Sequence, residues 1–205
     1  MTALVSRYRT FAGWIAFLVT SATAALVLLA ASRVLMDGPS PQPAVFWSVP
    51  RLGFALHLHV DGLTVFFLVL AAVIAVPAAF YSIAYLRLYQ GYSVARYYPP
   101  FLIFLAAMYG LVSTTDMMWF FFIFWQMMTL PGYALIRFEK HKPETRRAAN
   151  KYLIMMQIAC AATMAGAELL AVSGAASGGE LKYDFATVSA NLPALLLTRP
   201  GTAML

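Results

Sequence analysis

The carboxylate of Glu168 lies inside a long apolar stretch of the sequence, where it could hold and release a proton. An ionisable group within a membrane span is a functional candidate because burying an unpaired charge in lipid is expensive. Helical rise from Ala148 places Glu168 about 30 Å along its helix, close to the outer interface of the membrane. Two interpretations stay open: a residue at the level of the lipid headgroups, or a carboxylate through which protons leave.

Gln126 lies near the middle of another apolar stretch and is followed by Pro131. Proline cannot donate a hydrogen bond to the carbonyl of Met127, so it should distort the helix about one turn beyond Gln126. Freed carbonyls and an amide near the membrane midplane often line water-filled or interhelical cavities. The alternative is a packing amide that is hydrogen-bonded to a neighbouring helix and contributes about 1 kcal/mol. Residue chemistry alone favours this packing interpretation.

The elements that position these side chains follow from the composition of the chain. Its 205 residues are 62% hydrophobic and 11% charged, and the mean hydropathy is +0.75. Ordinary globular domains are about 45–50% apolar and about 25% charged. The apolar excess lies in long uncharged runs, which indicates membrane spans. The composition excludes a soluble enzyme and a disordered chain, and the single cysteine, Cys160, excludes a secreted disulfide scaffold.

Five uncharged stretches approach the roughly 20 residues that cross the hydrocarbon of a bilayer. They cover about 11–32, 62–86, 97–115, 117–136 and 148–173. The first is longer than the apolar region of a signal peptide, so we expect a retained helix. The sequence therefore predicts an all-α multi-pass membrane protein with about five transmembrane helices. We expect residues 1–10 to form a cytoplasmic N-terminus, 11–175 a five-helix membrane domain, and 176–205 an outward loop with an incomplete apolar tail.

The distribution of Lys and Arg predicts the orientation of these spans. With alternate crossings, ten of the 14 cations fall on the side of the N-terminus, three fall on the other side, and Arg199 is unassigned. Because positive charge concentrates in cytoplasmic loops, we expect an inner (cytoplasmic) membrane protein whose N-terminus is cytoplasmic. The net charge of +6 thus reflects topology, and no nucleic acid partner is expected. The ten are Arg7, Arg9, Arg87, Arg96, Arg137, Lys140, Lys142, Arg146, Arg147 and Lys151, and the three are Arg33, Arg51 and Lys182.

The first outward loop is predicted to contain a short extended or β segment. Residues 52–60 alternate large apolar side chains with others, which is typical of a strand. His57 and His59 would share one face and could begin a metal site, but no third ligand is evidently placed to complete it. We therefore interpret the two histidines as a solvated strand face, and we expect neither a metal nor a cofactor.

The loop from Arg137 to Lys151 is strongly basic and allows two interpretations. It could anchor the topology and contact anionic lipids, or it could dock a soluble partner subunit. The sequence contains no phosphate-binding glycine loop, cysteine cluster or Ser/His/Asp arrangement, so no autonomous catalysis is expected.

Several motifs resemble those of antiporter-like membrane subunits. The most specific is Trp125–Ile136, which is similar to the family pattern WExxxLx(S/G)YxLI. Supporting segments are Leu58–Thr64, which is similar to an xxDGLS helix start, Gly91–Ser93, Asp116 and Ala148–Tyr152. The resemblance covers about residues 52–175. The family comprises the proton-pumping subunits of complex I, the Mrp-type sodium/proton antiporters and the membrane-bound nickel–iron hydrogenases. The residues around Pro131 in this motif resemble a branch like hydrogenase-4 component B.

The resemblance implies that such a subunit moves protons or sodium through a half-channel of broken helices and buried Glu, Lys and His, while separate subunits carry out redox chemistry. The ion-pathway candidates in this sequence are then Gln126, Pro131, Lys151 and Glu168. The implied partners are the lipid bilayer and the other membrane subunits of a redox-driven ion pump.

Two departures from the family pattern bear on function. Gln126 stands where the family carries a glutamate, and an amide cannot titrate. Family members are also longer, with a lysine-bearing broken helix that follows the region matched here. We therefore predict an N-terminal portion of, or a truncated, antiporter-like subunit of an NADH:quinone oxidoreductase or hydrogenase type of complex, which contributes to the ion half-channel. The alternative is a non-pumping structural scaffold subunit that anchors its neighbours.

Overall fold

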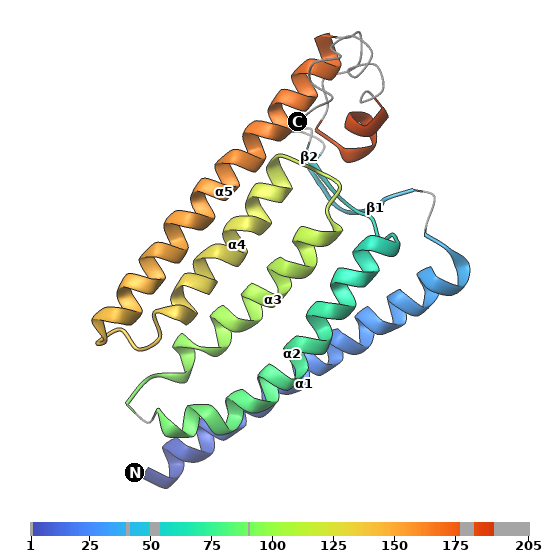
Figure 1. Ribbon diagram of the computed structural model, residues 1–205. Helices are drawn as coiled ribbons and strands as arrows, with labels where there is room; N and C mark the ends of the chain where they lie inside the picture. The colour runs from blue at the N-terminus through green and yellow to red at the C-terminus, as the bar shows by residue number, and fades with distance from the viewer. Residues whose placement is uncertain (1, 40–41, 50–53, 90, 177–182, 191–205) are drawn as a thin grey trace.

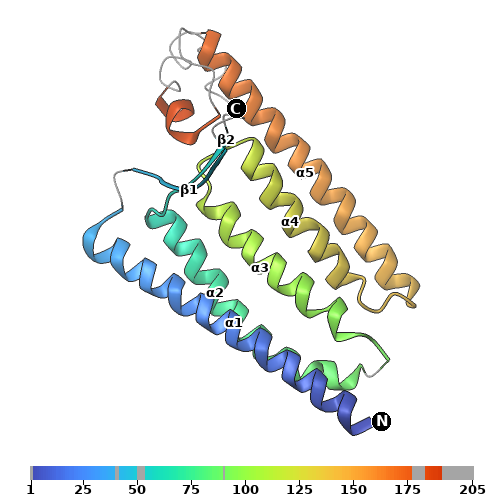
Figure 2. The same ribbon diagram turned by 180° about the vertical axis from the view of Figure 1, so that it is seen from behind.

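Five long helices lie side by side and alternate in direction in the computed structural model (Figures 1 and 2). The structure describes residues 2–39, 42–49, 54–89, 91–176 and 183–190. The prediction of an all-α multi-pass membrane protein with a small β segment is confirmed. In chain order the elements are α1 (Thr2–Asp37), β1 (Ala44–Val49), β2 (Phe54–Leu58), α2 (Gly62–Leu88), the short 3₁₀ helix η2 (Val94–Arg96), α3 (Tyr98–Ser113), α4 (Trp119–Ile136) and α5 (Pro143–Ala176).

Four of these helices are long and apolar enough to cross a membrane: Tyr8–Asp37, Gly62–Leu88, Trp119–Ile136 and Pro143–Ala175. The remaining predicted span, 97–115, is the shorter helix α3 of 16 residues. It is about 24 Å long at the rise of an α-helix, and it lies between α2 and α4 (Figure 1). Its start follows η2 and carries Pro99 and Pro100 in the first turn, where proline is tolerated. Its end is the extended residue Thr114.

Two helices begin earlier than the hydropathy pattern predicts. α1 begins at Thr2, so residues 2–10, predicted as a cytoplasmic N-terminus, continue the helix of the first span. α5 begins at Pro143 and takes up part of the predicted basic loop. Lys, Arg and Glu have good helix propensity, and proline fits the first turn of a helix, so charge marks the limit of a span without ending its helix. Within the predicted outward tail, residues 185–190 are helical, while the apolar segment Leu192–Leu197 lies outside the described residues.

The predicted strand is confirmed as β2, and its partner β1 was not predicted. The two strands are antiparallel, with Ala44 opposite Leu58 and Val49 opposite Phe54. Just beyond β2, the amide of His59 donates to the carbonyl of Ser113 at 2.8 Å. The amide of Thr115 donates to the carbonyl of His57 at 3.2 Å. The hairpin therefore contacts the turn between α3 and α4, at the end of the bundle where α2 begins.

Close helix packing is achieved by small residues. α1 contacts α2, and the buried face of α1 carries Ala16, Ala24 and Ala31 at spacings that place them on one side of the helix. Between α3 and α4 the close approach depends on Gly110, because a Cβ atom at this position would clash with the ring of Phe124. Small residues at such interfaces let helix backbones approach in a membrane, where no hydrophobic force drives helices together.

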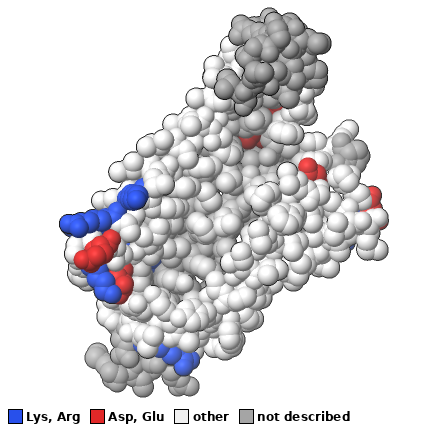
Figure 3. All heavy atoms as spheres, viewed as in Figure 1, with Lys and Arg blue, Asp and Glu red and all other residues white. Residues whose placement is uncertain are grey.

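The two ends of the bundle differ in charge (Figure 3). At one end Arg9 donates to the carbonyls of Tyr89 at 2.9 Å and Tyr92 at 2.5 Å, which ties the start of α1 to the turn after α2. We call this the basic end; it also holds Arg87, Arg96, Arg137, Lys140, Lys142, Arg146 and Arg147. The opposite end holds Asp61, Asp116 and Asp184, and Asp116 Oδ1 accepts from the amides of Met118 and Phe120 at the start of α4.

Candidate functional site

The side chain of Gln126 on α4 forms a reciprocal pair of hydrogen bonds with Gln157 on α5. Gln126 Nε2 donates to Gln157 Oε1 at 2.9 Å, and Gln157 Nε2 donates to Gln126 Oε1 at 2.8 Å. Both side chains are half-buried. Each amide therefore satisfies a donor and an acceptor of the other across the helix interface. This is the interhelical hydrogen bond that the packing interpretation of Gln126 requires.

The neighbouring residues add a third hydrogen bond between the same two helices. Trp125 Nε1 donates to the backbone carbonyl of Met156 at 3.1 Å. Two consecutive residues of α4 thus contact two consecutive residues of α5. Trp125 contacts Met156 through its indole, and Gln126 contacts Gln157 through the side-chain amides. These three hydrogen bonds fix the rotation of α4 relative to α5 near the middle of α4.

The polar contacts continue along the two helices toward the basic end. Tyr133 Oη donates to Asn150 Oδ1 at 3.3 Å. Arg137 Nη1 donates to Tyr133 Oη at 3.0 Å, and its guanidinium carbon lies 5.8 Å from the centroid of the Tyr133 ring. We call the set Gln126, Tyr133, Arg137, Asn150 and Gln157 the polar seam. It runs from the middle of α4 to the loop that joins α4 to α5.

Thr129 lies between the two levels of the polar seam. Its side chain is fully buried, and its Oγ1 atom has no hydrogen-bond partner among the described residues. Its neighbour Gly132 faces α5, because a Cβ atom there would lie 2.5 Å from the hydroxyl of Tyr152. Since Gln126 and Tyr133 also contact α5, helical spacing puts Thr129 on this same face. An unpartnered buried hydroxyl costs about 1–3 kcal/mol, so Thr129 is a polar point inside the interface.

The four ion-pathway candidates of the sequence do not form one cluster. Gln126 belongs to the polar seam. Pro131 follows Phe124 by two turns, so it lies on the side of α4 that faces α3, and α4 remains helical through it. Lys151 is on the exposed side of α5, and no hydrogen bond or ion pair joins it to any described residue.

Glu168 lies far along α5, toward the end opposite to the basic end. It follows Gln157 by eleven residues, which places it on a similar face of the helix and about 16 Å away. The phenol of Tyr183 donates a hydrogen bond to Glu168, and this bond raises the pKa of Tyr183 above its ordinary value. Glu168 therefore contacts the segment that follows α5 and has no direct link to the Gln126–Gln157 pair.

Sequence reasoning missed Gln157, although the signal that marked Gln126 applies to it equally. Both are amides within uncharged stretches of predicted spans. The pair has no titratable group, so it cannot bind or release a proton. Among the described residues, no group of three or more His, Cys, Asp or Glu side chains is placed to hold a metal ion.

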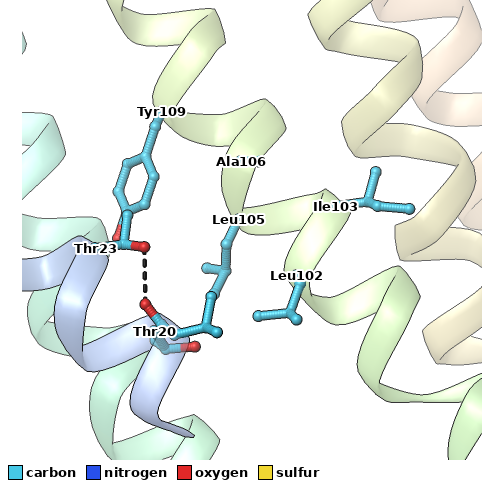
Figure 4. A pocket seen from close by; sticks show the side chains of 8 residues that line it. Thr20, Thr23, Leu102, Ile103, Leu105, Ala106 and Tyr109 are labelled. Carbon is cyan, nitrogen blue, oxygen red and sulfur yellow. Dashed lines mark hydrogen bonds between the residues drawn. The ribbon is translucent and has the colours of Figure 1, made fainter. Parts of the chain in front are cut away.

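A separate cavity of about 310 Å³ lies between α1 and α3 (Figure 4). Its wall is mostly apolar, and it includes Thr20, Thr23 and Tyr109. Thr23 Oγ1 donates to the carbonyl of Val19 at 2.8 Å. The hydroxyls of Thr20 and Tyr109 have no partner among the described residues. None of the described residues that line this cavity is a carboxylate, lysine or histidine, so they offer no group that titrates near neutral pH.

The chain is similar to membrane subunits from several bacteria. It is 34% identical over 113 residues to NADH-quinone oxidoreductase subunit M of Escherichia coli, which covers 53% of this chain and 21% of that protein. Over 147 residues it is 26% identical to Na(+)/H(+) antiporter subunit A1 of Staphylococcus aureus, which covers 72% of this chain and 18% of that protein. The chain is thus similar to subunits of an NADH-quinone oxidoreductase and of a Na(+)/H(+) antiporter.

The similarity covers only a small part of the length of each relative. The chain spans about a fifth of the length of the curated relatives it matches, and this holds also for an uncharacterized protein of Mycobacterium tuberculosis that is 31% identical over 139 residues. That match covers 68% of this chain and 21% of the relative. No protein-family model matches the chain.

Proposed function

We propose that this chain is a membrane-embedded part of an antiporter-like subunit in a redox-driven complex that translocates protons or sodium, and that its α4–α5 pair acts there as a structural scaffold. The homology to subunits of both an NADH-quinone oxidoreductase and a Na(+)/H(+) antiporter supports the first part. The reciprocal hydrogen bonds between Gln126 and Gln157 support the second. The partners are then the lipid bilayer and other membrane subunits.

The scaffold role follows from the chemistry of the amide pair. A titrating carboxylate at position 126 could pass a proton, whereas an amide has a fixed protonation state. Each of the two amides donates a hydrogen bond to the other and accepts one from it, so the pair contributes to helix association. Interhelical side-chain hydrogen bonds of this kind contribute about 0.6–2 kcal/mol within a membrane. The site thereby fixes how α4 lies against α5 without being a step in an ion path.

The test is the Gln126→Ala variant in the complex purified through a tag on this chain. Two quantities are measured: the yield of assembled complex, and the number of ions moved per electron in reconstituted vesicles. The scaffold predicts a lower yield and an unchanged ratio of ions to electrons. A normal yield with a reduced ratio contradicts it and assigns Gln126 to an ion path.

The second candidate function, a contribution to the ion half-channel, is favoured by a different observation. The polar seam continues to the basic end, and Thr129 adds a buried hydroxyl without a partner between its two levels. The Thr129→Val variant removes this hydroxyl at nearly constant volume. A half-channel predicts fewer ions per electron in the fully assembled variant complex, and the scaffold predicts no change.

The redox partner is proposed from the same similarities. Homology to NADH-quinone oxidoreductase subunit M favours the NADH–quinone type of complex over the hydrogenase type. The purified complex is therefore expected to oxidise NADH with a quinone acceptor. Hydrogen-dependent reduction of an acceptor dye, without NADH oxidation, would assign it instead to the hydrogenase branch.

The orientation is proposed from charge. The basic end faces the cytoplasm and the N-terminus of α1 is cytoplasmic, because cytoplasmic segments carry the excess of Lys and Arg. The check is labelling of single cysteines at Ser93 and Thr187 with a membrane-impermeant thiol reagent, in a Cys160→Ser background. We expect labelling of the Thr187→Cys variant in spheroplasts, in which the cytoplasmic membrane is still intact. Labelling of Ser93→Cys instead would reverse the orientation.

A further inference from the structure

A pocket with a volume of about 510 Å³ lies at the basic end, between the start of α3 and the end of α4. It does not include the Gln126–Gln157 pair, and its existence does not depend on the proposed function. Three of its lining residues are cations, and they come from three different segments. The lining includes Arg96, Pro100, Tyr133, Arg137, Phe138 and Lys140.

None of the described residues in the wall of this pocket is a carboxylate that could pair with its three cations. Arg96 is in η2, Arg137 caps the end of α4, and Lys140 lies in the loop between α4 and α5. The carboxylate next to Lys140 in sequence, Glu139, is engaged by Lys142, with Nζ at 2.9 Å from Oε1. No ion pair joins the three cations to any carboxylate among the described residues. The pocket thus presents a local excess of positive charge that is ready for an anion.

One of the cations is held in place. Arg137 donates through Nη1 to the hydroxyl of Tyr133 at 3.0 Å, and Tyr133 in turn donates to Asn150 at 3.3 Å. This hydrogen bond engages Nη1 and restrains the side chain, while no described residue accepts from its other N–H groups. An arginine held in this way matches the paired oxygens of a phosphate group.

The remainder of the wall is apolar and leads to the lipid-facing surface. Phe138 is buried, and Pro100 and Ala134 add apolar atoms. Leu130, one turn before Ala134 on the same face of α4, is an exposed apolar side chain on a helix of a membrane protein. A ligand with an anionic head and apolar tails therefore fits this surface, because cations at the helix ends match the head and apolar side chains along the helices match the tails.

We propose that this pocket binds the phosphodiester headgroup of an anionic membrane phospholipid, whose acyl chains follow the outer surface of α3 and α4. Basic pockets between membrane helices on the side that carries positive charge are suited to such headgroups. The phosphate lies among Arg96, Arg137 and Lys140, and the exposed apolar side chains contact the acyl chains.

The test uses the full chain with the subunits that purify with it, delipidated in a neutral detergent. Short-chain phosphatidylglycerol is the probe, short-chain phosphatidylcholine is the neutral lipid, and inorganic phosphate is the soluble anion. Binding is measured by native mass spectrometry. We expect one phosphatidylglycerol per chain to bind at least tenfold more tightly than phosphatidylcholine, and we expect inorganic phosphate not to displace it.

The variant pair separates a built pocket from general surface charge. The variant with Arg96→Gln, Arg137→Gln and Lys140→Gln is expected to weaken binding by roughly 100-fold, at about fivefold for each cation. The control carries Arg146→Gln, Arg147→Gln and Lys151→Gln, which remove the same charge from the same end outside the pocket. It should weaken binding by less than about fivefold.

Three results would overturn the proposal: equal weakening by both triple variants, equal affinity for the two lipids, or complete displacement by inorganic phosphate. Should the pocket variant fail to assemble, Arg137→Gln and Arg137→Lys test the same point with one side chain. The first is expected to weaken binding about fivefold and the second less, because it keeps the charge. Unchanged affinity in Arg137→Gln also contradicts the proposal.

Discussion

The α1–α2 pair and the α4–α5 pair show two ways of joining helices in one membrane protein. Along its buried face α1 meets α2 through alanines, and the polar link between them is at the basic end, where Arg9 donates to carbonyls. The α4–α5 pair has its polar link in the middle of α4, through Gln126 and Gln157. Small residues suffice to bring helices close. The amides of α4 and α5 therefore specify rotation and register, which close packing alone leaves open.

The largest expected effect concerns the alanine-packed pair. Ala16 is 1% exposed, so Ala16→Leu must push α1 away from its neighbours. Overpacking of this kind destabilises by about 1–3 kcal/mol. The matched control is Ala22→Leu in the same helix, where the side chain is exposed. Unfolding in mixed micelles with increasing SDS measures both, and equal stability of the two variants would show that α1 does not pack through this face.

The next effect concerns the amide pair. Gln126→Leu leaves Gln157 as a half-buried amide without its partner, which costs about 1 kcal/mol, and Gln157→Leu does the same to Gln126. The double variant removes both amides and leaves neither without a partner. Its loss of stability should therefore be about 1 kcal/mol smaller than the sum of the two single losses. The same SDS unfolding measures this coupling. Additive losses would mean that the two amides do not interact.

The stability of the α1–α2 helix pair and that of the α4–α5 helix pair should depend differently on pH. Asp61 caps α2, and its carboxylate accepts from the amide of Thr64 at 2.8 Å. This hydrogen bond lowers the pKa of Asp61 below its ordinary value of 3.8. Because the folded-state pKa is the lower one, the cap stabilises α2 fully above the ordinary pKa, and the contribution is lost as the pH falls through the folded-state value.

The Asp61→Ala variant should lose about 1 kcal/mol at pH 6. Asp61→Asn should lose less, and should flatten the dependence of stability on pH below about 4. The Gln126–Gln157 pair has no proton to gain, so Gln126→Leu should cost the same at pH 4 and pH 6. Thermal unfolding at the two pH values gives the comparison. A cost of Gln126→Leu that changes with pH would show that a titrating group interacts with the Gln126–Gln157 pair.

The smallest effect is expected at the end of the polar seam. Tyr133→Phe removes the hydroxyl that contacts both Asn150 and Arg137, and these contacts are exposed. A loss of about 0.5 kcal/mol is expected, near the average for interhelical hydrogen bonds. Tyr81→Phe, at a side chain that is 65% exposed, is the control and should change nothing measurable. A loss at Tyr133 as large as that at Gln126 would place the centre of the seam at the basic end.

The sequence predicted the spans better than their ends. Apolar runs located α2 and α4 to within two residues at either end, because lipid requires continuous apolar length. α3 likewise ends two residues before the predicted 115, where Thr114 and Thr115 pair with β2, a contact between segments far apart in the chain. The start of α5 was missed because charged residues end a hydropathy run but continue a helix.

The site was half predicted for a similar reason. Gln126 and its hydrogen-bonded interpretation could be read from the sequence, because an amide in an apolar run needs a partner. The identity of that partner depends on how α4 and α5 are rotated about their axes. Gln157 is 31 residues away in the chain, and no local pattern fixes that rotation. The same limit explains why Pro131, Lys151 and Glu168 were grouped with Gln126, although the structure places them on other faces or at another level.

The most direct test of the central claim is the ratio of ions moved per electron in vesicles that contain the complex with Gln126→Leu and Gln157→Leu together. This double variant replaces both amides by apolar side chains, so that neither amide is left without its partner. The account predicts that the assembled complex keeps the wild-type ratio, because the amide pair joins the helices and passes no ion. A reduced ratio in fully assembled complex would contradict it.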